Sequence, residues 1–238
     1  MKNSIPKPEN AISTRGSGRA RPHLGPVATR SARRALATRE ASHDDAVRRL
    51  VAASFALIRE TGSLEPSVAS IVRRAGLSNQ AFYRHFRSKD ELLLGVLDEG
   101  FRVLAGYLAH RMANAGDAEA RIRAWIGGVL EQALQGDAAA ATRPFAVSRA
   151  RLSELFPEEV EASERELTRP LQLAIAEGVA DGGLPGADPE RDALAIHTLA
   201  MGWVQRKLCQ REPAQREEAD HLTAFALGAL HRSSAAGA

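Results

Sequence analysis

The chain has 238 residues, of which 44% are apolar and 26% charged, and Cys209 is its one cysteine. Such a composition is that of one or two globular domains rather than of a disordered chain. A single cysteine excludes an intramolecular disulfide framework and a multi-cysteine metal site. The longest uncharged apolar-rich run, 193–205, is shorter than the ~18 residues that a membrane span needs. We therefore expect a soluble, cytoplasmic protein with no membrane partner.

Basic residues are concentrated near the start of the chain. Residues 1–43 contain nine basic and two acidic residues, whereas residues 91–238 contain 15 basic and 22 acidic ones. This asymmetry predicts that the first part of the protein meets a polyanion. Because residues 1–43 lack apolar periodicity and are rich in Pro, Gly and Ser, we expect a disordered basic arm. The arm is a solvated tail without a role, an arm that adds affinity for phosphates, or a transit peptide.

From residue 44 onward, apolar residues recur at helical spacing, with almost no strand-like alternation. The pattern predicts an all-α fold. The first helix is expected to begin near a Ser42 cap and to end at Gly62. A short second helix over 68–75 follows and ends at Gly76.

The next two helices carry their own start signals. Ser78 can cap a third helix over 79–86, and Ser88 with Glu91 forms a capping box that opens a long fourth helix. Pro170 should kink or split the helix in which it lies. The remaining helices are predicted at 117–135, 137–155, 158–180, 189–210 and 214–232.

Residues 67–89 predict a helix-turn-helix, because a three-residue turn containing glycine joins two short amphipathic helices. Such a motif places the first residues of its second helix in the major groove of DNA. The alternative interpretation is an ordinary helical hairpin with a solvated charged face.

The outward positions of this motif carry side chains suited to DNA. Asn79 and Gln80 can pair with adenine edges, and Tyr83 and His85 can donate to phosphate oxygens. Lys89 lies at the start of a helix, where an anion is favoured. The expected DNA-binding residues are Ser67, Ser78, Asn79, Gln80, Tyr83, Arg84, His85 and Lys89.

This stretch resembles the DNA-binding domain of the tetracycline-repressor (TetR) family. The matching pattern is Ile71-x-x-x-Ala75-Gly76-Leu77-Ser78-x-x-x-Phe82-Tyr83-x-His85-Phe86-x-Ser88-Lys89-x-x-Leu92. One position departs from it, because Val72 stands where the family often has alanine, and this could change the angle between the two helices slightly. The resemblance covers about residues 44–93, and beyond them only helical content and length agree.

The resemblance implies an all-α homodimer with a small N-terminal helix-turn-helix domain and a larger domain for ligand binding and dimerisation. We expect the first over 44–93 and the second over 94–233, after the arm 1–43. In the family, the last two long helices usually form the dimer interface, and a bound ligand changes the separation of the two DNA-binding domains and releases the operator.

The last two predicted helices fit a dimer interface. The helix over 189–210 has apolar residues on two faces, and such a helix must be covered on both. The helix over 214–232 adds a further apolar stripe. A dimer would bind a near-palindromic operator. The alternative is that both stripes fill the core of a single-chain bundle.

Large side chains in the second half are candidates for an effector pocket, although each could equally belong to an ordinary core. Arg143 could anchor an acidic ligand or pair with a carboxylate. The candidate ligand-binding residues are Phe101, Tyr107, Trp125, Arg143, Phe145, His197 and Trp203, and Phe156 is a further option.

The sequence thus predicts a ligand-responsive transcriptional repressor that binds double-stranded DNA and an unidentified small molecule. The alternative is a helical ligand-binding or scaffold protein that does not bind DNA. We do not expect an enzyme, because the chain has no GxSxG, GxxxxGK[ST] or HExxH motif. The seven histidines lack metal-ligand spacing, so we expect no metal and no cofactor.

Overall fold

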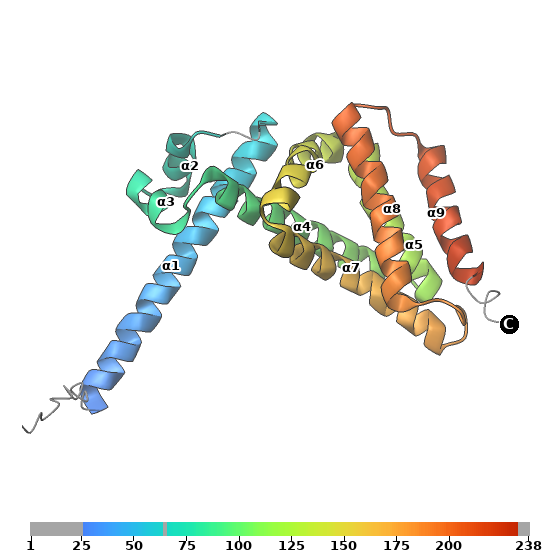
Figure 1. Ribbon diagram of the computed structural model, residues 1–238, viewed down its shortest axis with the longest axis horizontal. Coiled ribbons are helices and arrows are strands. Elements are labelled where there is room, and N and C mark those ends of the chain that lie inside the picture. The colour runs from blue at the N-terminus through green and yellow to red at the C-terminus, as the bar shows by residue number, and fades with distance from the viewer. Residues whose placement is uncertain (1–25, 64–65, 233–238) are drawn as a thin grey trace, which may run out of the picture. The chain divides into compact units, whose positions relative to one another are not determined.

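The computed structural model describes residues 26–63 and 66–232. Within these ranges the chain forms helices and no strands, which confirms the all-α prediction (Figure 1). The chain divides into two units, 1–42 and 43–238, which we describe separately. No helix in the described ranges is long and apolar enough to cross a membrane.

Helix α1 (Pro26–Thr61) begins earlier than expected. Residues 26–43, expected to be disordered and to precede a cap at Ser42, are helical, so the predicted start of the first helix is wrong. This segment has no apolar periodicity, but it is rich in alanine and arginine, and both residue types favour a helix. Residues 26–42 belong to the first unit, and residues 1–25 of the predicted arm lie outside the described residues.

Helices α2 (Val68–Ala75) and α3 (Asn79–His85) form the predicted pair. The Ser67 hydroxyl oxygen accepts a hydrogen bond from the backbone N–H of Ser70 at 3.1 Å, and the Ser78 oxygen accepts one from Ala81 at 3.2 Å. Each serine therefore satisfies a backbone donor of the first turn that has no partner inside the helix.

The turn between α2 and α3 is fixed by a glycine and by an arginine of α1. Gly76 has φ +63°, a left-handed conformation that side chains rarely adopt. Arg49 donates from Nε to the Ala75 carbonyl at 3.0 Å, and from Nη2 to the Ala75 and Gly76 carbonyls at 2.5 and 3.2 Å. The guanidinium thus holds the free carbonyl end of α2 against α1.

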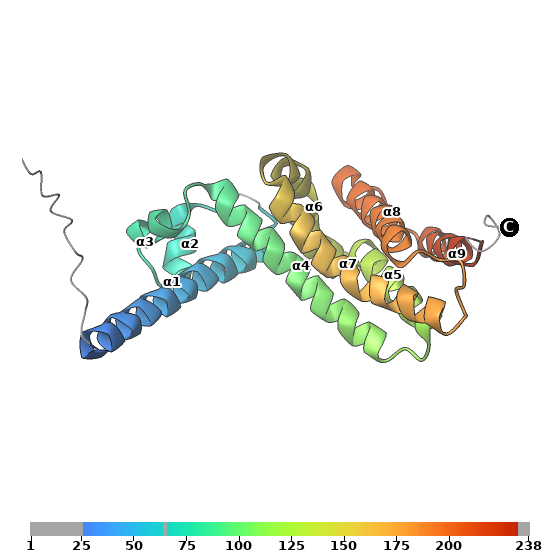
Figure 2. The same ribbon diagram turned by 60° about the horizontal axis from the view of Figure 1, so that its bottom comes forward.

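Helix α4 (Lys89–Ala113) opens with the predicted capping box. The Ser88 hydroxyl oxygen accepts from the Glu91 N–H at 3.1 Å, and the Glu91 carboxylate accepts from the Arg87 N–H at 2.6 Å. Figure 2 shows α4 running from the side of α2 and α3 towards α5 (Ala118–Leu134).

Two apolar cores meet along α4. The first core packs α1, α2, α3 and the start of α4, and the second packs the rest of α4 against the later helices. Val96 belongs to the first core and Leu97 to the second. The first core consists of Leu50, Ala53, Ile58, Ile71, Val72, Ala75, Phe82, Phe86, Leu92 and Val96.

The later helices surround Trp125, which is fully buried and donates its indole N–H to the Leu167 carbonyl at 3.2 Å. Helix α7 continues through Pro170, so the helix is not split there. Leu167 and Leu171 are fully buried on either side of Pro170, and this packing offsets the missing backbone hydrogen bond. The helices are α5 (Ala118–Leu134), α6 (Gly136–Leu155), α7 (Pro157–Ala180), α8 (Pro189–Gln210) and α9 (Arg216–Arg232).

Replacing Gly76→Ala is expected to lower the free energy of unfolding by about 1–2 kcal/mol, the cost of a side chain in the left-handed region. The added Cβ would lie 2.9 Å from Arg49 Nη2, so the guanidinium must also move off the carbonyls. Urea denaturation followed by circular dichroism measures the change.

Gly106→Ala is the matched control, because a Cβ at Gly106 meets nothing within 4 Å and alanine favours a helix. We expect this variant to be unchanged or more stable by up to ~1 kcal/mol. Equal stability of Gly76→Ala and the native protein would show that the turn does not depend on its glycine.

Candidate functional site

The start of α3 presents an exposed polar surface. Asn79 and Gln80 are the first two residues of the helix and both are exposed. Tyr83 lies one turn after Asn79 on the same side and is 66% exposed, whereas Phe82 is buried and anchors the helix in the core. Lys89, the first residue of α4, is also exposed. The structure therefore leaves these four predicted DNA contacts accessible.

The charge around this surface is positive. Residues 66–89 contain five basic residues and no acidic one. Arg74 pairs with Glu60 at 2.6 Å, whereas no ion pair involves the other four within the described ranges. The four are Arg73, Arg84, Arg87 and Lys89, all of them exposed. A surface with unpaired cations attracts phosphates whatever the base sequence.

His85 is less accessible than predicted. Its ring lies 4.4 Å from that of His43, and its Nδ1 atom is buried without a hydrogen-bond partner. Burial lowers the pKa of His85, and the nearby charges of His43 and Arg84 lower it further. His85 is therefore a neutral ring at neutral pH, and it can offer a phosphate an N–H donor but no positive charge.

The two capping serines are both exposed. Ser67 donates its hydroxyl to the Ser70 hydroxyl oxygen at 3.1 Å, so its proton already has an acceptor. The Ser78 hydroxyl only accepts among the described residues, and its proton is available to an incoming phosphate oxygen.

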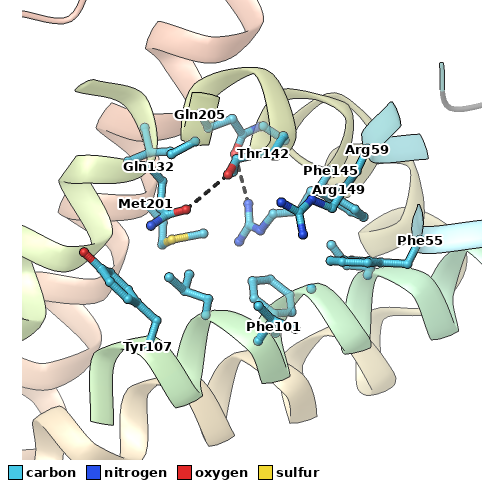
Figure 3. A pocket seen from close by; sticks show the side chains of 18 of the residues that line it. Phe55, Arg59, Phe101, Tyr107, Gln132, Thr142, Phe145, Arg149, Met201 and Gln205 are labelled. Carbon is cyan, nitrogen blue, oxygen red and sulfur yellow. Dashed lines mark hydrogen bonds between the residues drawn. The ribbon is translucent and has the colours of Figure 1, made fainter. Parts of the chain in front are cut away.

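A second candidate site is a cavity of about 380 Å³ (Figure 3), which is within the usual size of small-molecule pockets. Its walls come from α1, α4, α5, α6 and α8, and they are mostly apolar. Among the residues predicted from sequence, Phe101, Tyr107 and Phe145 line it.

The other predicted ligand-binding residues lie elsewhere. Trp125 and His197 are buried in the second core, with ring centroids 6.2 Å apart. Arg143 donates from Nε to the Leu208 carbonyl at 3.0 Å, and Trp203 lines a groove between α8 and α9. Phe156 packs against the second core. These five residues do not line the cavity, because they lie on helix faces that point towards other helices.

The cavity also contains residues that sequence reasoning missed. Phe55 and Arg59, one turn apart on α1, lie at the same end as Phe145, as Figure 3 shows. Their spacing marks one face of α1, but the pattern does not reveal which helix that face meets. The missed polar residues of the wall are Arg59, Gln132, Asp137, Thr142, Arg149 and Gln205.

Most polar groups in the wall are already paired. Thr142 donates to Gln132 Oε1 at 3.2 Å, and Arg149 donates to Gln205 Oε1 at 3.0 Å, the two dashed contacts in Figure 3. Arg149 also donates from Nε to Glu164 at 2.7 Å. Burial raises the pKa of Glu164, but hydrogen bonds and charges from His197 and Arg149 outweigh it and lower the pKa overall. Glu164 is therefore an anion that neutralises Arg149.

Within the described ranges, no group of three or more His, Cys, Asp or Glu side chains is placed to hold a metal ion.

Known proteins resemble the part of the chain that carries the first of these sites. Residues 50–96 match the model of the family described as "Bacterial regulatory proteins, tetR family". The chain is 33% identical over 95 residues to the HTH-type transcriptional regulator BetI of Yersinia pestis (strain Pestoides F), which is 39% of this chain and 48% of that protein. BetI of Proteus mirabilis (strain HI4320) is 35% identical over 74 residues, 31% of this chain and 37% of that one. The chain thus spans half or less of the length of these curated relatives.

Solved structures share the fold over most of the chain. A TetR transcription regulator from Haloarcula marismortui has a TM-score of 0.60 at 20% identity, covering 78% of this chain and 98% of its own. RolR in complex with resorcinol has a TM-score of 0.60 at 14% identity, covering 83% and 96%. FadR from Bacillus subtilis in complex with stearoyl-CoA has a TM-score of 0.55 at 17% identity, covering 78% and 98%.

The regulators found in these comparisons agree with the expectation that the chain is not an enzyme. The matched segment 50–96 is thus similar to the DNA-binding part of the tetR family of bacterial regulatory proteins.

Proposed function

We propose that this protein is a transcriptional regulator that binds a near-palindromic DNA operator as a homodimer and is released by a small-molecule effector. The observation that carries the proposal is the pair of exposed amides, Asn79 and Gln80, at the start of a capped helix. The sign of regulation is repression, which the family resemblance implies. A protein that binds the bacterial chromosome works in the cytoplasm, as the sequence predicts.

Each exposed group has a distinct role on DNA. Asn79 and Gln80 read base edges in the major groove, because a side-chain amide can donate and accept towards adenine at once. Tyr83, Ser78 and Lys89 bind phosphates and set the position of α3 on the duplex. Arg84, exposed and without an ion pair among the described residues, adds to the phosphate contacts.

The cavity supports effector control. It is apolar, of a suitable volume, and lined by α1, which also packs into the core of the DNA-binding domain. A ligand in the cavity therefore touches a helix on which the position of α3 depends. The structural neighbours RolR and FadR are bound to resorcinol and stearoyl-CoA respectively, which is further support for a small-molecule site.

Dimerisation is supported by uncovered apolar side chains on the last two helices. Leu194 and Phe225 are 62% and 55% exposed, and Leu199 is also exposed. Leu199 and Phe225 line the same groove between α8 and α9. A second copy of the chain would remove these side chains from water.

Replacing Tyr83→Phe or Lys89→Gln should weaken binding to every duplex by a similar factor, because phosphate contacts carry no sequence information. Replacing Asn79→Ala or Gln80→Ala should instead change which bases are preferred, by ~1–3 kcal/mol for each lost pair. Gel shifts with the DNA that flanks its own gene at ~100 mM salt, followed by base-substituted duplexes, measure both effects.

Arg165→Gln is the control, because Arg165 is exposed on α7 and, within the described part of the chain, pairs only with Glu161. Its affinity for DNA should equal that of the native protein. The absence of a specific band for the native protein would favour the alternative of a helical ligand-binding or scaffold protein, and equal loss on all duplexes for Gln80→Ala would remove Gln80 from the base readers.

The double substitution Leu199→Glu and Phe225→Glu should convert the dimer to a monomer, because two buried charges would face the partner's apolar surface. Leu155→Glu, an exposed leucine at the end of α6, is the control and should remain dimeric. Light scattering coupled to gel filtration gives the mass of each variant. A dimer that survives the double substitution would place the interface elsewhere.

A further inference from the structure

We propose that the effector is an organic anion, an apolar body with one carboxylate, sulfonate or phosphate group, and that this group pairs with Arg59. The inference depends on the proposed function, because it assigns a ligand class to the same cavity. The inference adds that the charged group of the ligand binds to α1, the first helix of the DNA-binding domain.

Arg59 is the cation in the cavity wall whose charge is not neutralised. It is exposed, its guanidinium lies 5.7 Å above the centre of the Phe55 ring, and no ion pair involves it within the described ranges. The other cation of the wall, Arg149, is neutralised by the half-buried carboxylate of Glu164. A ligand anion entering the cavity therefore finds one cation free to bind it.

The geometry places the anion at one end of the cavity. Arg59 and Arg149 lie together at the end opposite Tyr107 (Figure 3). Asp137, also without an ion pair among the described residues, is in the first turn of α6, and Arg149 follows on the same helix about 18 Å further along its axis. An anion at the Arg59 end is therefore not repelled by Asp137 at short range.

The remaining walls suit an apolar body. The rings of Phe55, Phe101 and Phe145 and the side chain of Met201 face the cavity in Figure 3. Thr142, Gln132 and Gln205 already have hydrogen-bond partners in the protein, so the ligand need not supply them. A charge pair beside apolar walls is stronger than one in water, and a guanidinium binds a carboxylate or sulfonate through two parallel hydrogen bonds.

Arg59 also connects the ligand to the DNA-binding domain. Its neighbour Ile58 is fully buried in the first core, and Arg49 on the same helix holds the turn before α3. An anion that draws Arg59 towards α6 and α8 therefore acts on the element that positions α3.

Two fluorescent probes with the same aromatic body test the proposal on the full chain without DNA. They are 8-anilinonaphthalene-1-sulfonate, which is an anion, and N-phenyl-1-naphthylamine, which is neutral. The native protein should bind the anionic probe more tightly, and Arg59→Gln should weaken that binding by about tenfold, as expected for one charge-assisted pair. The affinity for the neutral probe should change less than about twofold, and Arg59→Lys should restore part of the anionic binding.

Two further variants locate the probes. Ala141→Trp fills the cavity and should abolish the binding of both, whereas Arg165→Gln should change neither. Displacement of the anionic probe by 1-naphthoate and by decanoate, each compared with its uncharged alcohol, shows whether the body is aromatic or acyl.

Several results would overturn the inference: no binding of the anionic probe, equal affinity of the native protein for both probes, equal effects of Arg59→Gln on both, or unchanged binding in Ala141→Trp. Because no DNA is present, each of them leaves the operator-binding proposal standing, and the gel shift decides that proposal separately.

Discussion

The hydrogen bonds from Arg49 to the carbonyl end of α2 are the interaction on which the DNA-binding surface depends. They hold a turn whose direction is set by the left-handed Gly76, and α3 begins only three residues later at Asn79. A change in that turn would rotate α3 as a whole. Under the proposed function, the amides of Asn79 and Gln80 would then no longer face the major groove, although both residues would still be present. The proposed specificity therefore depends on Arg49, which lies on α1 and outside the proposed base-reading pair.

Helix α1 serves both candidate sites. Arg49 binds the turn, and Phe55 and Arg59 line the cavity one to three turns further along the same helix. An α-helix is stiff over such a distance, so a displacement at the cavity is passed to the turn with little loss. One helix thus connects the cavity with the turn that precedes α3.

Local chemistry accounts for what the sequence predicted well. The caps at Ser78 and Ser88 and the stop at Gly76 depend on neighbours within four residues, and all three lie where the pattern placed them. The start of α1 could not be predicted from apolar spacing, because its first residues carry no apolar stripe. The cavity was predicted only in part. Phe101 and Phe145 could be named from the sequence because they are large aromatic residues, whereas the role of Arg59 depends on how α1 packs against α6. That packing angle leaves no periodic trace in the chain.

The passage of α4 through both cores has a consequence for how the protein can be divided. Val96 belongs to one core and the next residue, Leu97, to the other, so α4 has no linker segment between the two cores. Cutting the chain there would expose half of an amphipathic helix on each fragment. We therefore expect the part of the chain that carries α2 and α3 to lose stability when it is separated from the later helices.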